Sequence, residues 1–450
     1  MTCVAALATL WTAMSCSRRA FVGGVSAAAL GACATRDHGA PAGTSAPLES
    51  AAPTFASLAG FCDGVEPVSE AEYGERRERA AERMEAASIG ALWMEAGPTL
   101  TYFTGVRWGR SERPLLCCLS AGGSYGFVAP SFEQRTLLER AGEVEVEVIV
   151  WDEHESAYAG AAELAGALGV RERDAALETT TRSFVGAGLA RSGVARGWRA
   201  EANVGRETRI IKSQLELARL RRATEATKAS LRAVAEIVTP GMTEDDVRRL
   251  VTDAQAAAGL QRVWALVLFG ANASFPHGTN QRRVLAEDDL VLVDTGGFLH
   301  GYASDVTRTW AATEASRIDD GRRTAFDVVV RAQRAAMSMI VEGAEADKAD
   351  ARARAVIAAA GYGADYETFT HRLGHGIGLE VHEAPYLVRG STRRLSAGMT
   401  MSNEPGLYVP GRWGIRIEDI VAVTGSEPEV FGPRAESLEA PFGSVAATTG

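Results

Sequence analysis

A short stretch in the C-terminal half carries a large share of the chain's imidazole groups. Three of the seven histidines, His371, His375 and His382, lie within twelve positions, and glycines surround the middle one. Glycine lets a backbone pass close to a ligand and adopt torsions that other residues avoid. Imidazoles on such a tight backbone predict a metal-binding or substrate-binding site. A histidine-rich surface loop is the alternative, because short motifs also arise by chance.

Four acidic residues in or beside apolar, strand-like runs could complete such a site. They are Asp294, Asp305, Glu404 and Glu418. Acidic residues are depleted from strands and are rarely buried unless they are paired or bind a metal. Hard divalent metals also prefer carboxylate oxygen over nitrogen alone. Any one of these acids could be a structural ion-pair residue, but the four together with His375 form a coherent ligand set for two metal ions.

The local patterns indicate how these acids are positioned. Glycines separate the strand that holds Asp294 from the strand that holds Asp305. If the two strands pair antiparallel, both aspartates can face one site. Residues 414–420 alternate as a strand would, which places Arg416 and Glu418 on one face. We expect the charge of Arg416 to help keep Glu418 ionised.

The wider pattern favours two folded regions. In residues 68–205, strands alternate with helices, which predicts an α/β layer. The expected helices there are 69–87, 131–141, 156–168 and 183–191, and the expected strands are 89–94, 115–119, 125–128 and 144–151. In the second region, the expected helices are one from 213 that ends at Pro240-Gly241 and others at 243–259, 322–342 and 347–360. A strand is expected at 263–269, and residues 371–423 are expected to be mostly strands and loops. Ser69 with Glu72, Ser213 with Glu216 and Thr243 with Asp246 have the spacing of helix capping boxes.

The order and flanking residues of the candidate ligands resemble those of the pita-bread metallopeptidases. The segment Arg209-Ile-Ile-Lys212-Ser213 and the α/β region before it are similar to the aminopeptidase P and prolidase branch. The resemblance implies an α/β (α+β) chain with a creatinase-like N-terminal domain over 68–205, a pita-bread catalytic domain over 206–435 and a tail over 436–450.

The resemblance assigns roles to the five candidate ligands. Asp294 would chelate the first metal ion, Asp305 and Glu418 would bridge two ions, and His375 and Glu404 would complete the second site. A hydroxide that bridges the ions would be the nucleophile, and Glu404 would accept its proton. The resemblance and the carboxylate-rich set favour two divalent ions, with manganese first and zinc, cobalt or iron as alternatives.

Five other assignments concern the substrate and follow from the same resemblance. His382 would stabilise the tetrahedral intermediate, while His277 and His371 would contact the substrate. Arg416 and Tyr408 would line the pocket, although Tyr408 and His371 could instead be ordinary packing residues.

The implied activity is that of an aminopeptidase that hydrolyses the Xaa-Pro bond at the N-terminus of peptides with proline at the second position. A prolidase, which is an Xaa-Pro dipeptidase, is the alternative. A peptide-binding relative without activity and a creatinase-type hydrolase are rivals that the intact ligand set argues against.

The N-terminus has the features of an export signal. Ser17-Arg-Arg-Ala-Phe-Val22 matches a twin-arginine signature, an apolar run follows, and Leu30-Gly-Ala-Cys33 resembles a lipobox. We therefore expect residues 1–33 to be a twin-arginine lipoprotein signal and 34–67 a tether. The protein would then be an exported bacterial lipoprotein on the periplasmic side of the envelope. The alternative is an alanine-rich leader with a chance arginine pair.

Composition limits the other partners. An apolar share of 46% and a charged share of 23% are typical of a soluble globular protein, and 450 residues can form two or three domains. The net charge of −10 and the lack of a basic stripe argue against nucleic acid. We expect contact with a membrane only through the lipid anchor, and a homodimer or larger homo-oligomer. Cys62, Cys117 and Cys118 remain after processing, and we expect the last two to be buried.

Overall fold

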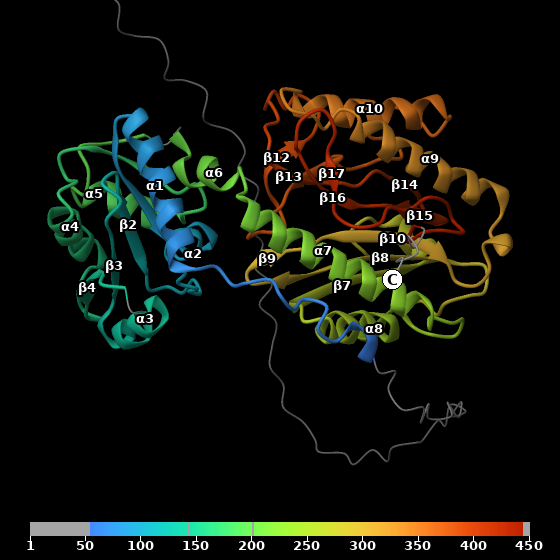
Figure 1. Ribbon diagram of the computed structural model, residues 1–450, viewed down its shortest axis with the longest axis horizontal. Coiled ribbons are helices and arrows are strands. Elements are labelled where there is room, and N and C mark those ends of the chain that lie inside the picture. Colours follow the sequence, from blue (N-terminus) through green and yellow to red (C-terminus); the bar gives the residue numbers. More distant parts are fainter. Residues whose placement is uncertain (1–54, 143, 200–201, 444–450) are drawn as a thin grey trace, which may run out of the picture. The chain divides into compact units, whose positions relative to one another are not determined.

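The computed structural model describes residues 55–142, 144–199 and 202–443 (Figure 1). The expected signal sequence, residues 34–54 of the expected tether and the end of the tail lie outside the described residues. The described part belongs to one compact unit that spans Thr54–Gly450. Among the described residues, no helix is both long and apolar enough to cross a membrane.

The N-terminal region is built on a mixed six-stranded sheet with the order β4-β3-β2-β1-β5-β6. Strand β1 runs antiparallel to β2 and parallel to β5. The strands are β1 (Ile89–Glu95), β2 (Leu116–Ser120), β3 (Tyr125–Pro130), β4 (Glu147–Trp151), β5 (Asp174–Leu177) and β6 (Gly197–Trp198). The helices are α1 (Glu70–Ala86), α2 (Pro98–Thr104), α3 (Gln134–Ala141), α4 (Ala157–Ala167), α5 (Ser183–Arg191) and α6 (Val204–Arg209).

Side-chain alternation along β1 explains why helices cover both faces of this sheet. Leu92 and Met94 pack in one buried cluster with residues of α1, α2 and α3. Ala91 and Trp93 point the other way and pack with α4 and α5. The expected α/β layer is therefore confirmed.

The C-terminal region contains three sheets. Strands β10, β8 and β7 form one sheet with β9 at its side, strands β12-β11-β13-β16-β17 form the second, and β14 pairs with β15. The strands are β7 (Gln261–Phe269), β8 (Leu290–Leu299), β9 (Tyr302–Ala303), β10 (Val306–Ala311), β11 (Gly374–Gly376), β12 (Glu383–Leu387), β13 (Thr400–Asn403), β14 (Gly406–Val409), β15 (Trp413–Arg416), β16 (Asp419–Ala422) and β17 (Glu429–Val430). The helices are α7 (Gln214–Ala235), α8 (Glu244–Ala257), α9 (Asp320–Met337) and α10 (Ala346–Ala359).

These helices lie on two outer faces with the strands between them (Figure 1). Helices α7 and α8 share a buried cluster with β7, β8 and β10. Helices α9 and α10 share another with β13, β14, β15 and β16. The inner strands, covered on both sides, hold the polar residues described below.

All three expected capping boxes are present. The side chains of Ser69, Ser213 and Thr243 each accept a hydrogen bond from the backbone three residues later, and the acidic residue there bonds back. Helix α7 ends at Ala235, before the expected stop at Pro240.

Two expectations about the backbone were wrong. Residues 414–420 do not form one strand, because β15 ends at Arg416 and β16 begins at Asp419, and the two strands pair with different partners. Residues 55–67 are not a free tether. Leu58 and Cys62 are buried in the cluster that contains α7 and α8, and Arg219 donates hydrogen bonds to the carbonyls of Glu66 and Pro67.

Candidate metal and substrate site

The antiparallel pair β8 and β10 brings the two aspartates together. Thr307 lies directly opposite Asp294 in the register, so their side chains share one face of the sheet. Asp305 lies one residue before the start of β10, and its ligand atom lies within 4.8 Å of ligand atoms of Asp294 and Glu418. The expectation that both aspartates face one site is confirmed.

The glycines around His375 serve the packing of strands. A Cβ at Gly374 would lie 2.0 Å from the carbonyl oxygen of Ser402, and one at Gly376 would lie 2.1 Å from that of Ala384. Only glycine fits such approaches. The His375 backbone N–H also donates to the Ser402 hydroxyl at 3.0 Å. Strand β11 is therefore held tightly between β12 and β13, which fixes the imidazole of His375.

The acidic residues and histidines converge on one point. Three overlapping groups each offer one ligand atom per residue, with all ligand atoms of a group within 4.8 Å of one another. The groups are Asp294 with Asp305 and Glu418, His375 with Glu404 and Glu418, and Asp305 with His375 and His382. The five residues expected as metal ligands are thus brought together. His382, expected to contact the substrate, also lies within ligand range.

Unpartnered oxygen atoms indicate what this cluster can hold. The Asp294 Oδ1, Asp305 Oδ1 and Glu418 Oε1 atoms are buried, and each lacks a hydrogen-bond partner among the described residues. A buried carboxylate oxygen without a partner is costly. Divalent cations at this point would satisfy all three atoms, so the donor set fits a pair of metal ions.

The charges in the cluster support the same conclusion. Burial, reinforced by neighbouring carboxylates, raises the pKa of Asp305 and of Glu418 well above the usual range. Burial also opposes ionisation of Glu404, but a hydrogen bond from His375 and nearby positive charge lower its pKa to about 2. The protein alone therefore cannot ionise every carboxylate of the cluster, and cations are needed to do so.

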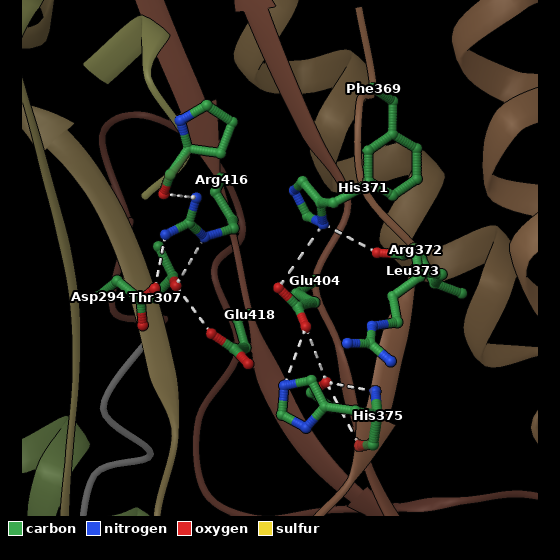
Figure 2. Close-up of polar contacts among 12 residues, drawn as sticks. Asp294, Thr307, Phe369, His371, Arg372, Leu373, His375, Glu404, Arg416 and Glu418 are labelled. Atoms are coloured by element: carbon green, nitrogen blue, oxygen red, sulfur yellow. Dashed lines mark hydrogen bonds and ion pairs between the residues drawn. The ribbon is translucent and has the colours of Figure 1, made fainter. Parts of the chain in front are cut away.

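The charge of Arg416 acts to lower the pKa of Glu418, as expected, but its guanidinium is hydrogen-bonded to other residues. Its Nη2 donates to Asp294 Oδ2 at 2.6 Å, and its Nε donates to Thr307 Oγ1 at 3.1 Å (Figure 2). Thr307 in turn donates to Glu418 Oε2 at 2.8 Å. The break between β15 and β16 separates Arg416 from Glu418, so the hydrogen-bond link between the two residues runs through Thr307.

Four of the five residues expected to contact the substrate line one cavity, and the fifth lies behind it. His277, His371, His382 and Arg416 line a cavity of about 440 Å³ that also contains the five candidate ligands. The remaining lining residues are Trp264, Leu266, Pro276 and Arg372. Tyr408 does not line this cavity. It is 2% exposed and lies behind His371, to which it is hydrogen-bonded.

Sequence reasoning missed the residues that support His382. The next residue, Glu383, is buried and accepts hydrogen bonds from Lys212 Nζ at 2.7 Å and from Arg209 at 2.5 Å. Burial alone would raise the pKa of Glu383, but these two cations lower it. The signal was present, because Arg209 and Lys212 belong to the segment that carried the family resemblance. Trp264, Thr307 and Arg372 had no comparable signal.

The comparisons with known proteins agree with this geometry. Residues 218–425 match metallopeptidase family M24, and residues 76–187 match the creatinase/prolidase N-terminal domain. The chain belongs to metallopeptidase family M24. It is 36% identical to the probable dipeptidase PepE of Mycobacterium bovis over 78% of this chain and 92% of that protein. An Xaa-Pro dipeptidase of Lactobacillus delbrueckii is 38% identical over 51% of this chain and 62% of its own.

A solved structure extends the likeness to the whole fold. Dipeptidase PepE from Mycobacterium ulcerans superposes with a TM-score of 0.76 at 34% identity, covering 83% of this chain and 99% of that one. The enzyme is therefore an M24 metallopeptidase with a creatinase-type N-terminal domain and a pita-bread catalytic domain. The family is dinuclear, and the ligand cluster described above fits two ions.

Proposed function

We propose that this enzyme is a prolidase, which hydrolyses the bond before proline in Xaa-Pro dipeptides. The observation that carries the proposal is the two-metal ligand cluster opening into a cavity of about 440 Å³ with an apolar wall. Two of the similar proteins described above are named dipeptidases and one an Xaa-Pro dipeptidase, which favours dipeptides over longer chains. An Xaa-Pro aminopeptidase, the activity that the sequence favoured first, is the second candidate.

The residues of the cluster have complementary tasks in this reaction. Divalent metal ions, when bound, acidify water and stabilise negative charge on a carbonyl oxygen. Glu404 is ionised at neutral pH, as a proton acceptor must be, and the hydrogen bond from His375 that lowers its pKa to about 2 would be released when His375 binds a metal ion, which makes the carboxylate a better base. Burial and the neighbouring His375 lower the pKa of His382, so its imidazole is neutral and can donate one hydrogen bond to the substrate oxygen.

The cavity also suits a proline ring. An Xaa-Pro bond has no N–H, so the pocket needs no acceptor at that point. Trp264 and Leu266 lie opposite Gly296 and Asp294 in the register of β7 and β8. They form an apolar wall beside the candidate metal ligands, with Pro276 nearby in the same lining.

The proposal can be tested with purified protein and Mn²⁺. We expect Ala-Pro to be cleaved at least about tenfold faster than Ala-Ala, since one hydrophobic contact changes specificity by roughly that factor. Asp294→Asn should abolish activity, while Asp288→Asn should not, because Asp288 is 70% exposed and lies outside the cavity. Equal rates on Ala-Pro and Ala-Ala would instead indicate a general dipeptidase.

A further inference from the structure

Helix α10 carries a buried ion pair on the face that it turns toward the core. The other buried residues of this helix are apolar, namely Ala346, Ala349, Ala353 and Ile357. Asp350 and Arg354 lie among them and are 1% and 6% exposed. Arg354 donates to the Asp350 carboxylate from Nε at 2.8 Å and from Nη2 at 3.0 Å. Charged residues are rarely buried without a specific task, so the other contacts of the pair indicate its role.

Arg354 makes its remaining hydrogen bonds with a single loop. Its Nη1 donates to the carbonyls of Asp365 at 2.5 Å and of Phe369 at 2.8 Å, and its Nη2 donates to the carbonyl of His371 at 2.5 Å. With the two bonds to the carboxylate, these contacts occupy all five N–H groups of the guanidinium. The guanidinium carbon also lies 4.3 Å from the centroid of the Phe369 ring. An ion pair that served only the helix would not be bonded to the loop in this way.

The loop has no regular secondary structure that could hold it in place. Residues 360–373 connect α10 to β11 without forming a helix or a strand. Backbone carbonyls that are buried in such a loop need hydrogen-bond donors from elsewhere. Arg354 supplies them, and Oδ1 of Asp350 accepts the backbone N–H of Leu373 at 3.1 Å. The pair therefore fixes the backbone at four points between residues 365 and 373.

The fixed loop carries two residues of the metal cavity, His371 and Arg372. The carbonyl of His371 is bonded to Arg354, and its ring packs edge-on against Phe369 with centroids 5.0 Å apart. The Nδ1 atom of the same ring lies 3.9 Å from Oε2 of Glu404, a candidate metal ligand (Figure 2). The contacts thus run without interruption from α10 to the ligand cluster.

We infer that the buried pair Asp350–Arg354 positions the His371 imidazole in the metal cavity by holding the backbone of residues 365–373. Asp350 and Arg354 are positioning residues, since neither is among the residues that line the cavity. The inference rests on the proposed Xaa-Pro hydrolysis for its substrate and adds a support from outside the site. In a merely structural role, the pair would stabilise α10 and change the rate only through the amount of folded protein.

Arg354→Lys is the variant that tests the inference. Lysine keeps a positive charge beside Asp350, but its three N–H groups lie on one nitrogen and cannot reach all three loop carbonyls. We expect kcat/KM for Ala-Pro, measured with the Mn²⁺-loaded enzyme, to fall roughly ten- to a hundredfold, because small displacements of a positioned group have effects of this size. Metal content should stay native, because no candidate ligand is altered.

A double-mutant cycle with His371→Ala shows whether the loss passes through His371. When the imidazole is already absent, Arg354→Lys should lower kcat/KM by less than about twofold. A merely structural defect would cause the same fractional loss in both backgrounds. Arg352→Lys, at an exposed arginine of the same helix, is the matched control and should behave as native.

Hydrogen exchange tests the inference without any substrate. The backbone amides of residues 360–373 should exchange about tenfold faster in Arg354→Lys, the effect of losing one or two hydrogen bonds. The amides of helix α9 should keep their native rates, which separates a local effect from global destabilisation. If Arg354→Lys does not fold, Asp350→Asn goes through the same measurements, because asparagine keeps an oxygen for the Leu373 N–H but loses the charge that holds Arg354.

Three results would overturn the inference. They are native kcat/KM in Arg354→Lys, equal fractional losses in the two backgrounds of the cycle, and native exchange rates in residues 360–373. Failure of the native enzyme to cleave Ala-Pro would instead reject the proposed function, and the exchange measurement would still decide the inference.

Discussion

The hydroxyl of Tyr408 lies 2.8 Å from Nε2 of His371. The same hydroxyl accepts a hydrogen bond from Nη1 of Arg416, so its own proton must go to His371. The other ring nitrogen, Nδ1, then carries the hydrogen and donates to the Arg372 carbonyl at 2.8 Å. Burial lowers the pKa of His371 to about 4, which agrees with this neutral tautomer. Tyr408 therefore orients both cavity residues without touching the cavity itself.

Tyr408→Phe should test this positioning. The change removes the hydroxyl and leaves one Arg416 donor and His371 Nε2 unpaired, at a cost of about 1–3 kcal/mol for a buried group. We expect kcat/KM to fall about tenfold or more, with metal content unchanged, because no candidate ligand is altered. Tyr366→Phe, at a tyrosine that is 39% exposed, is the control and should behave as native. Loss of metal from Tyr408→Phe would mean that the tyrosine also supports the ligand cluster.

The buried ion pairs of Glu383 predict a second effect. In Glu383→Gln, Lys212 and Arg209 would lose their shared carboxylate, and breaking one side of a buried pair costs about 3–5 kcal/mol. We expect a corresponding drop in the free energy of urea unfolding, together with lower activity because His382 is the adjacent residue. Glu380→Gln is the matched control, since among the described residues the Glu380 carboxylate pairs with Arg209 and with no second cation, and its side chain is 32% exposed. Similar losses in both variants would contradict the assigned role of Glu383.

Most of the fold could be predicted because its determinants are local. The capping pairs at Ser69, Ser213 and Thr243 mark the start of α1, α7 and α8 in sequence as they do in structure. Helix α2 was missed because it is short, beginning with Pro98 and ending at Gly105. The tether was placed too far along the chain, since the packing of Leu58 against α7 depends on contacts distant in sequence.

The candidate site shows the same limit. The expected antiparallel pairing of two strands was enough to bring Asp294 and Asp305 to one site. The partner of Arg416 could not be inferred from alternation, because the break between β15 and β16 turns it toward Asp294, 122 positions away. Arg372 could not be singled out from the sequence, because it differs from an ordinary exposed arginine only in lining the cavity and in having no ion pair with the residues that the structure describes.

The proposed cellular location has its own test. If residues 1–33 form a twin-arginine lipoprotein signal, replacing Arg18 and Arg19 with Lys should leave the protein in the cytoplasm. Cys33→Ala should release it from membranes without stopping export. Fractionation with an antibody against the catalytic region measures both outcomes. Unchanged export of the double lysine variant would reject the proposal.

Removal of the metal ions should reveal how much the buried carboxylates lower the free energy of unfolding. In the metal-free protein the folded-state pKa of Asp305 lies above its unfolded value, so the folded form binds more protons between the two values and its stability falls as pH rises. Asp305→Asn removes this cost. At pH 8, metal-free Asp305→Asn should be more stable than metal-free native protein by at least about 1.4 kcal/mol, the value of one pKa unit.

The difference should shrink toward pH 5, where Asp305 takes up a proton at less cost. Added Mn²⁺ should reverse the order, because only the native protein keeps the full ligand set. Urea unfolding with and without a chelator gives both comparisons. Equal stability of the two metal-free proteins from pH 5 to pH 8 would show that the Asp305 carboxylate does not destabilise the folded protein in the absence of metal.

The last prediction separates ligands from substrate residues. Glu418 takes part in two of the three ligand groups, so Glu418→Ala should lose metal from both positions and almost all activity. His382 also lies within ligand range, but its exposed ring packs edge-on against His375 with centroids 4.1 Å apart, which suits a group that contacts substrate. In His382→Ala we expect about two metal ions per chain and turnover lowered by roughly a hundredfold or more, the scale of one lost transition-state donor. Elemental analysis beside the rate constant of each variant decides the assignment. Loss of metal in His382→Ala would show that His382 is a ligand, and two ions with full turnover in Glu418→Ala would show that Glu418 is not one.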